Sequence, residues 1–509
     1  MRSIAQAVLV LLLVTACSTP ADPTTAPYWI ARLGDRQERT EALTQLGKIG
    51  DKQAVPAVRK WFETPGEWQP AAAYTLGQLG DPSVVPQLVA ARNPSVGSGR
   101  DRDTNIKNRV NINAARALAM LGAKQAAPDL LKLLSVPDNG TREAAIGSLG
   151  MLGNPIVVEP LIGVARDEQD PFVRKAAVEA LGHLGDRAAV PVLVRMLFAE
   201  PEGVSFYGSA RLALIQLGAP AEAALLATLV RRNDDIETMR QGAGEPLPAG
   251  VIEAKAASVL GAMHAATARE AIISTLDKLD KQLKRGGAAK ALKPVVVELL
   301  YASGMVGGTG SARVLLPFLR DADADIRIAA MEAMTTAGDA SAVGALLQAA
   351  RSGPPEARLA AIVAASRLGD GSHLAAFDGL GASVGNDTET LLAEAVAAER
   401  VRLVAAGACK RDVACWRSKL GDSDIKVRER ASFELGWLGA KAAIADLMKV
   451  AQDADPQVRM AAVMSIGRLG GANPDELQRI YDAWDGKAEY AAANAELRTT
   501  IARLRQKRS

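Results

Sequence analysis

Residues suited to catalysis are scarce and scattered in this chain of 509 residues. Its three histidines, His183, His264 and His373, lie far apart and belong to no His-Glu-x-x-His metal pattern. The stretch 203–207 (GVSFY) lacks the second glycine of a nucleophile elbow, and no strand pattern surrounds it. The glycine-rich stretch 304–310 (GMVGGTG) lacks the Lys-Ser/Thr pair of a phosphate-binding loop. These motifs therefore predict no catalytic residues, no metal site and no cofactor.

A pair of cysteines, Cys409 and Cys415, lies within an irregular part of the sequence. In an oxidising compartment, two cysteines six residues apart can close a small disulfide loop across a turn and the start of a helix. Two reduced, buried thiols are an alternative. A metal site is less well supported, because two thiolates without a nearby histidine do not complete a tetrahedral zinc site. We therefore expect a disulfide between Cys409 and Cys415.

The first residues predict an export signal. A basic start precedes an apolar run over residues 4–16, which is too short to span a bilayer as a mature helix. The run ends in LVTAC at Cys17, which resembles the lipobox of bacterial lipoproteins. This resemblance implies that residues 1–16 are a signal peptide and that Cys17 is lipidated. An ordinary cleaved signal with an incidental cysteine is the alternative.

The segment that follows predicts a tether. Residues 17–27 are rich in Pro and Thr and poor in apolar side chains, so they should have no fixed structure. Ser18 follows the cysteine, and under the sorting rule of enterobacterial lipoproteins this residue implies the outer membrane. We therefore expect a lipid-anchored protein of the cell envelope, on the periplasmic face of the outer membrane.

The overall composition favours a repeat architecture. The chain is longer than one globular core usually allows, and aromatic residues make up only 4% of it. Lys and Arg number 60 against 57 Asp and Glu, without a long basic run before the last residues. Since phosphate binding depends on clustered cations, nucleic acid is a poor candidate partner.

One phrase recurs along the chain: Ala-x-x-x-Leu-Gly-x-x-Gly-Asp, followed by Ala-Val-Pro-x-Leu. Its second glycine returns every 30 to 33 residues where no insertion intervenes. Apolar residues at helical spacing precede this glycine and predict a first helix, which the glycine ends in a left-handed conformation. The Asp and Pro that follow predict the start of a second helix. The second glycine is found at Gly50, Gly80, Gly122, Gly153, Gly185, Gly218, Gly307, Gly338, Gly369, Gly407, Gly439 and Gly470, and is replaced near His264.

These units resemble short bacterial HEAT repeats of the kind found in phycobilisome lyase subunits, over roughly residues 30–484. The resemblance implies an all-α fold, a right-handed α-solenoid of about 12–13 HEAT-like helix pairs. We expect the solenoid to occupy residues 28–486. Residues 487–509 should form a C-terminal helix with a basic tail.

Three long connections, at about residues 92–111, 232–251 and 277–294, interrupt the array. Equivalent connections of a solenoid lie along one edge, so this edge is a candidate partner site. The first connection is predicted as a loop over residues 93–111; an ordinary solvated loop is the alternative. We also expect the second helices to line the concave surface. The candidate partner-binding residues are Arg100, Arg102, Lys107 and Arg109 in the first connection and Lys60, Lys132 and Arg195 on second helices.

The sequence therefore predicts a membrane-anchored scaffold of the bacterial cell envelope that binds a protein or peptide partner and is not an enzyme. Two alternatives stay open. Similarity to the lyase repeats raises a lyase- or chaperone-type subunit that acts on a protein substrate. The third hypothesis is a passive structural component of the envelope. A solenoid alone does not decide between these functions.

Overall fold

We describe the protein from a computed structural model, which covers residues 22–97, 101–241, 247–308, 310–381 and 387–506. Throughout these ranges the regular elements are helices, in agreement with the predicted all-α solenoid. None of the helices within these ranges is long and apolar enough to cross a membrane. Cys17, the predicted signal peptide and Arg100 lie outside the described residues.

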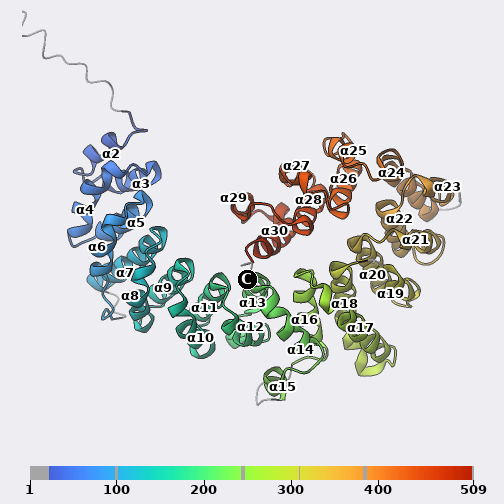
Figure 1. The fold of residues 1–509 in the computed structure, drawn as a ribbon, viewed down its shortest axis with the longest axis horizontal. Helices are drawn as coiled ribbons and strands as arrows, with labels where there is room; N and C mark the ends of the chain where they lie inside the picture. The colour runs from blue at the N-terminus through green and yellow to red at the C-terminus, as the bar shows by residue number, and fades with distance from the viewer. Residues whose placement is uncertain (1–21, 98–100, 242–246, 309, 382–386, 507–509) are drawn as a thin grey trace, which may run out of the picture. The chain divides into compact units, whose positions relative to one another are not determined.

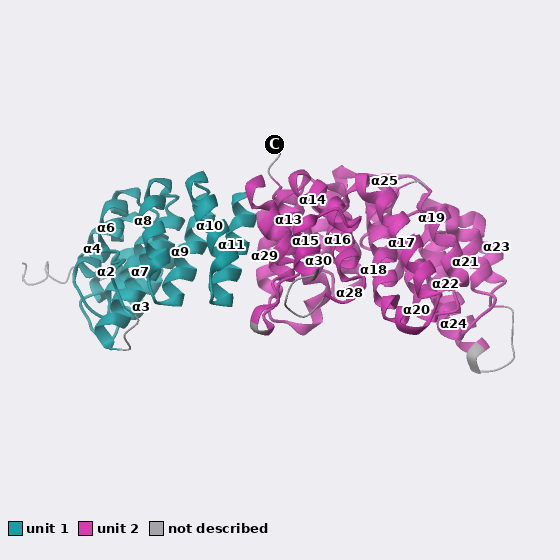
Figure 2. Cartoon of the chain, turned by 90° about the horizontal axis from the view of Figure 1, so that it is seen from below, with its two compact units in different colours: residues 1–184 teal, residues 185–509 magenta. Residues whose placement is uncertain are grey.

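The chain divides into two compact units, residues 1–184 and 185–509 (Figure 2). Most repeats within these ranges contain a first helix, a turn with a short 3-10 segment, and a second helix. The helices of unit 1 are α2 (Ala26–Arg32), α3 (Arg39–Ile49), α4 (Val55–Glu63), α5 (Gln69–Leu79), α6 (Val85–Ala91), α7 (Arg102–Met120), α8 (Ala127–Leu131), α9 (Asn139–Leu152), α10 (Val158–Asp167) and α11 (Pro171–Leu184).

Unit 2 continues the same alternation (Figure 1). Its first helices are α13 (Tyr207–Leu217), α16 (Val251–Ala262), α18 (Lys293–Val306), α20 (Ala324–Ala337), α22 (Pro355–Leu368), α24 (Asp387–Cys409), α26 (Ile425–Trp437), α28 (Pro456–Leu469) and α30 (Ala491–Leu504). Its other helices are α12 (Val190–Met196), α14 (Ala219–Leu229), α15 (Asp234–Gln241), α17 (Arg269–Leu283), α19 (Ser311–Leu315), α21 (Val343–Ala349), α23 (Leu374–Asp378), α25 (Val413–Lys419), α27 (Ile444–Val450) and α29 (Pro474–Trp484).

The turns between paired helices follow the predicted chemistry. Gly50 ends α3 in the left-handed region with φ of 70°, where glycine avoids a steric penalty. The Asp51 side chain then accepts a hydrogen bond from the Gln53 amide at 2.9 Å, and Pro56 lies in the first turn of α4. His264 takes the glycine's place with φ of 53°.

Three details of this register differ from expectation. Gly369 follows α22 with φ of −70°, in extended backbone and not in the left-handed region. Gly407 lies inside α24, and Lys410 adopts the left-handed conformation instead, with φ of 48°. The expected loop over residues 93–111 is also wrong, because α7 begins at Arg102. The Asn93 amide donates to the Asn111 side chain at 2.7 Å, and the Asn111 amide group donates back to the Asn93 carbonyl at 2.9 Å. These two hydrogen bonds hold the connection at Asn93 against Asn111 of α7.

The first glycine of the repeated phrase brings the first helices close together. A methyl group at Gly77 would lie 2.6 Å from the Cα atom of Ala117, and one at Gly304 only 2.5 Å from the carbonyl oxygen of Ala333. Glycines of second helices, such as Gly163 and Gly344, have no such neighbour within 4 Å. The first helices are therefore spaced more tightly than the second helices, and each unit bends towards them.

The expectation that second helices line the concave surface is consequently wrong. In unit 2 the first helices form the inner layer and the second helices the outer layer (Figure 1). Unit 2 also closes on itself, because α30 packs against both α28 and α13. Arg211 on α13 donates to the Thr499 hydroxyl of α30 at 2.9 Å, and the Gln506 side chain donates to the Ile215 carbonyl at 2.9 Å. The inner faces of helices far apart in the sequence thus meet.

Candidate functional site

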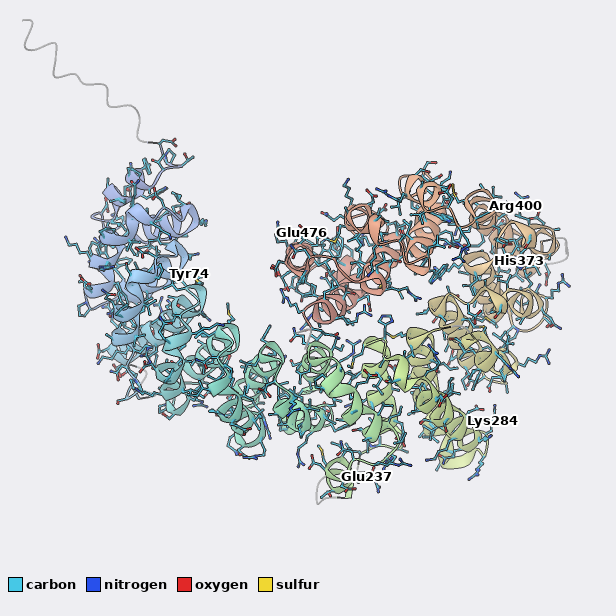
Figure 3. All side chains as sticks on the ribbon, in the orientation of Figure 1. Tyr74, Glu237, Lys284, His373, Arg400 and Glu476 are labelled. Atoms are coloured by element: carbon cyan, nitrogen blue, oxygen red, sulfur yellow. A yellow bond between two sulfur atoms is a disulfide. The ribbon has the colours of Figure 1, made fainter. Side chains whose placement is uncertain are left out.

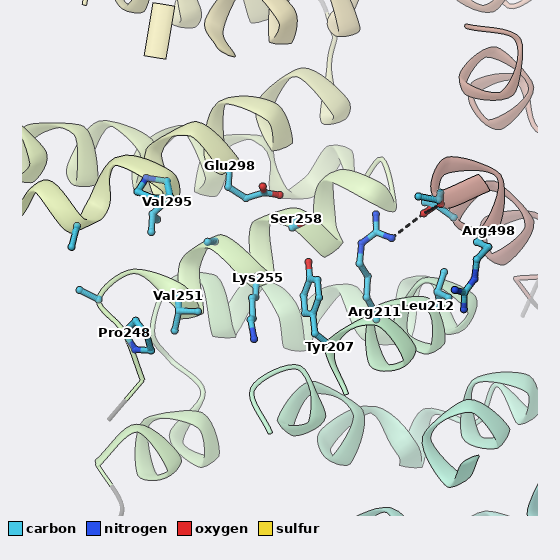
Figure 4. Close-up of a pocket in the computed structure, with 17 residues that line it drawn as sticks. Tyr207, Arg211, Leu212, Pro248, Val251, Lys255, Ser258, Val295, Glu298 and Arg498 are labelled. Atoms are coloured by element: carbon cyan, nitrogen blue, oxygen red, sulfur yellow. Dashed lines mark hydrogen bonds between the residues drawn. The ribbon is translucent and has the colours of Figure 1, made fainter. Parts of the chain in front are cut away.

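A cavity of about 810 Å³ lies on the inner side of unit 2, where α30 meets the first helices of the earlier repeats (Figure 4). Its walls come from α13, α16, α18 and α30 and from the chain just before α16. Its volume falls in the range of about 300–1,000 Å³ that is typical of small-molecule sites. The closure of unit 2 therefore creates a site that no single repeat contains.

Helical spacing places the lining side chains on one face of each wall helix. Tyr207 and Arg211 are four residues apart on α13, and Ala254 and Ser258 are four apart on α16. Residues at this spacing share a helix face, so they project together into the cavity. Most of the exposed wall is apolar, with Leu212, Val251, Ala254, Pro294 and Val295 among its members.

Polar groups are few and occupy one part of the wall. Tyr207 lies near Ser258, and burial raises the pKa of the Tyr207 hydroxyl, which stays protonated and can donate a hydrogen bond. Glu298 on α18 lines the same cavity without an ion pair to any described residue. The Glu298 carboxylate can accept hydrogen bonds and the Tyr207 hydroxyl can donate one, so the cavity offers a ligand both an acceptor and a donor.

Lys255 has a structural role in this wall. Burial lowers the pKa of its ammonium group. Its Nζ atom donates to the Leu197 carbonyl at the end of α12 at 2.8 Å and lies 5.1 Å from the centre of the Tyr207 ring. Both contacts favour the charged form of the amine, because the carboxyl end of α12 carries a partial negative charge and the Tyr207 ring attracts a cation. Lys255 therefore anchors α16 to α12.

Cations dominate the surroundings on the α30 side. Arg211 and Arg498 line the cavity, and the nearby Arg503 is buried with no hydrogen-bond partner for Nε or Nη1 within the described chain. Burial lowers the pKa of His264 to about 3, with Arg503 and Arg468 adding to the effect, so this imidazole is neutral at physiological pH. Its Nδ1 atom lies 2.8 Å from the Met305 carbonyl. The positive charges of Arg211 and Arg498 favour a ligand that carries an acidic group.

The predicted partner-binding residues lie elsewhere and do not form one cluster. Arg102 pairs with Glu67 at 2.7 Å and Lys107 with Asp103 at 2.5 Å, while Arg109 is exposed on α7. The remaining candidates belong to the second-helix layer: Lys60 is exposed on α4, Lys132 pairs with Asp129 at 3.0 Å and Arg195 pairs with Asp235 at 2.7 Å. Their role in partner binding stays a prediction.

Cys409 and Cys415 are joined by a disulfide in the structure, with Cα atoms 5.3 Å apart. The bond connects the end of α24 with α25, where Lys410 takes the place of the usual glycine. Trp416 follows the second cysteine and is fully buried, with its indole N–H donating to the Lys410 carbonyl at 2.8 Å. The disulfide thus belongs to an unusual turn of the solenoid and lies outside the cavity.

Comparison with known proteins agrees with this architecture. The family signature of HEAT repeats matches residues 26–102, 98–182, 312–399 and 414–497, more than half of the chain. The chain belongs to the HEAT-repeat family. Residues 173–198 also match the PBS lyase HEAT-like repeat. The expected HEAT-type solenoid is thereby confirmed.

Curated relatives of this HEAT-repeat protein include lyase subunits. It is 34% identical over 137 residues to the phycocyanobilin lyase subunit alpha of a Nostoc species, across 24% of this chain and 48% of that protein. It is 37% identical over 92 residues to the bilin biosynthesis protein PecE of Mastigocladus laminosus, across 18% of this chain and 34% of that protein. The chain thus spans less than half the length of these relatives.

Two solved structures to which the chain is similar are a lyase complex and an importin. The complex of CpcE and CpcF of phycocyanin lyase from Nostoc is 25% identical, with a TM-score of 0.24 over 56% of this chain and 97% of that chain. Yeast importin-beta is 14% identical, with a TM-score of 0.41 over 99% of this chain and 70% of that chain.

The expectation that this HEAT-repeat protein is not an enzyme is contradicted by its curated relatives. Three of them are named as phycocyanobilin lyase subunits. The sequence motifs predicted no catalytic residues. They gave no indication of Tyr207, Ser258 and Glu298, which lie on the successive first helices α13, α16 and α18 and line one cavity.

Proposed function

We propose that this protein is a lyase- or chaperone-type HEAT-repeat subunit that acts on a protein substrate. The cavity of unit 2 carries this proposal, because it gives an otherwise stacked array of helices a concave place for a bound group. The names of the lyase relatives support the same class of function. In this proposal the cavity binds a chemical group that is transferred to the protein substrate or is already attached to it.

The lining defines the chemistry of that group. An elongated, mostly apolar molecule matches the apolar wall, where its burial is favoured by the hydrophobic effect. A carboxylate on this molecule would face Arg211 and Arg498, the charged groups that recognise such anions through several N–H donors. Glu298 and Tyr207 would accept and donate hydrogen bonds beside the bound group.

Phycocyanobilin, which the relatives' names contain, is a suitable probe of this class. We expect saturable binding to the full chain, followed as a change in the pigment's visible absorption. Ser258→Trp should weaken binding by about tenfold or more, since an indole fills the space that the ligand needs. The matched control is Gln452→Trp, which adds the same side chain at an exposed position after α27. A linear, unsaturable response, or equal affinity of Ser258→Trp and wild type, would count against the proposed site.

We also propose that lipidation of Cys17 holds the two HEAT units at the bacterial envelope, on the periplasmic face of the outer membrane. The lipobox-like sequence that ends at Cys17 supports this proposal. Cys17→Ala should move the protein from the membrane pellet to the soluble fraction, because the acylation site is removed. Immunoblots of fractionated cells measure this shift, with Ser18→Ala as the control. Retention of Cys17→Ala in the membrane pellet would contradict the anchor.

A further inference from the structure

The inner face of unit 1 carries a second surface with a distinct pattern. Positions two, six and thirteen residues before the turn glycine recur on successive first helices and project to the same side. Figure 3 labels one of them, Tyr74 on α5. We define the unit 1 inner face by Lys48, Tyr74, Gln78, Arg109, Arg116, Met120, Met151 and Phe172.

The α3–α7 half of this face is a cationic groove. It encloses about 310 Å³ between α3, α5 and α7. Lys48, Arg109 and Arg116 line it, with Tyr74 between them. Asn113 at its floor donates to the Pro70 carbonyl at 2.8 Å, which ties α7 to α5. The groove is therefore built on rigid helices.

The three cations of the groove form no ion pair with any described residue, whereas three other arginines of unit 1 are paired. Arg102 contacts Glu67, Arg92 contacts Asp129 and Arg142 contacts Glu168. The nearby acid on α3, Glu41, accepts a hydrogen bond from Gln45 at 2.6 Å. Between Gln69 and Leu79, α5 contains no acidic residue at all. The groove thus has an uncompensated positive charge.

The other half of the face, from the end of α7 to α11, carries three exposed apolar side chains. Met120, Met151 and Phe172 are exposed by 43%, 68% and 61%, although large apolar side chains usually avoid water. Gly147 lies among them on α9, and a methyl group there would meet no atom within 4 Å. Glu179 and His183 on α11 also belong to this half and interact with other residues. Met side chains adapt their shape to different apolar partners.

We infer that the unit 1 inner face binds an extended segment of a partner protein that is acidic over α3–α7 and apolar over α9–α11. Acidic side chains complement Lys48, Arg109 and Arg116, and apolar side chains cover the exposed Met and Phe residues. Five first helices spaced about 10 Å apart span about 40 Å, or about twelve extended residues. This inference rests on the proposed function in that the segment belongs to the protein substrate.

A labelled synthetic peptide of about twelve residues tests the inference, with Asp and Glu in one half and Leu and Phe in the other. We expect saturable fluorescence anisotropy with the full chain, and an affinity that falls as salt is added. Arg109→Glu combined with Arg116→Glu should weaken binding by about tenfold or more, because attraction becomes repulsion. The matched control is Arg102→Glu combined with Lys132→Glu, which makes the same charge change at paired, exposed cations outside the groove.

Two altered peptides and one competitor complete the experiment. Replacing the acidic residues by Lys, or the apolar residues by Ser, should each weaken binding. Equal affinity of the control and groove variants, or a single-stranded oligonucleotide that binds more tightly than the peptide, would overturn the inference. Ser258→Trp should keep the affinity for the peptide, since that substitution lies in unit 2. If the wild-type chain binds the peptide but not phycocyanobilin, the cavity proposal alone fails; if it binds phycocyanobilin but not the peptide, the groove proposal alone fails.

Discussion

Replacing Glu429 with alanine should lower the free energy of unfolding by about 3–5 kcal/mol. Glu429 on α26 is only 2% exposed and lies between the guanidinium groups of Arg402 and Arg367. One of its oxygens lies 2.5 Å from the Arg367 Nη2 atom. Its removal leaves Arg402, which is 1% exposed, without one of its two carboxylate partners. A buried charge that loses its partner cannot recover its hydration.

The rest of the cluster does not compensate for this loss. Glu399 contacts Arg402, and it already accepts hydrogen bonds from Lys426 at 2.5 Å and from Ser366 at 2.7 Å. After the substitution, the cations of the cluster outnumber its single remaining carboxylate. Repulsion between Arg367 and Arg402 then adds to the desolvation cost.

Urea unfolding followed by far-UV circular dichroism measures this effect. The control is Arg400→Ala. Arg400 lies two residues before Arg402 on α24, and its substitution breaks an exposed ion pair with Asp378. Its partners are 47% and 43% exposed, so its loss should cost at most about 1 kcal/mol. Similar midpoints for both variants would show that the buried cluster contributes no more than a surface pair.

Gly304→Ala should destabilise unit 2 by about 1–3 kcal/mol or more, although alanine is the better helix former. The added methyl group would lie 2.5 Å from the Ala333 carbonyl oxygen and 2.7 Å from its Cα atom. These are backbone atoms, so α18 and α20 have to move apart, and the contacts along both helices suffer. Differential scanning calorimetry of the full chain measures the resulting fall in melting temperature.

The matched substitution is Gly344→Ala on α21. No atom lies within 4 Å of a methyl group at this position, so the helix gains stability without a clash. We expect an increase of about 0.5–1 kcal/mol, opposite in sign to the effect at Gly304. If both variants were stabilised, the first helices would not be held together by a close glycine contact.

The sequence predicted local structure well because its signals are local. A glycine such as Gly50, followed by Asp51 and Pro56, ends one helix and starts the next through contacts within a few residues. The same logic failed at Gly407, because α24 continues past it to Cys409 and turns at Lys410. There Gly407 packs against the backbone of Gly371, whose Cα atom would lie 3.0 Å from a methyl group at Gly407.

The inner and outer layers and the cavity depend on contacts that no repeat encodes by itself. The close approach of Gly77 to Ala117 joins residues of different repeats, and the periodicity alone does not tell which helix row lies inside. Arg211 and Thr499 are 288 residues apart in the sequence, yet their hydrogen bond helps to close unit 2. In the sequence, Met151 and Phe172 resemble any other helix residues. Only the structure shows that both are exposed on the same side of unit 1.

The packing of α30 against α13 also changes how unit 2 responds to alteration of its length. An open solenoid unfolds from its ends, and a repeat inserted or deleted in the middle shifts the rest without breaking an interface. In unit 2 the terminal helices protect each other's apolar faces, so neither of them is a free end from which the array can fray. Any change in the number of repeats between α13 and α30 displaces one partner from the other. Repeat number in unit 2 is therefore constrained by geometry, and its unfolding should be cooperative across the whole unit.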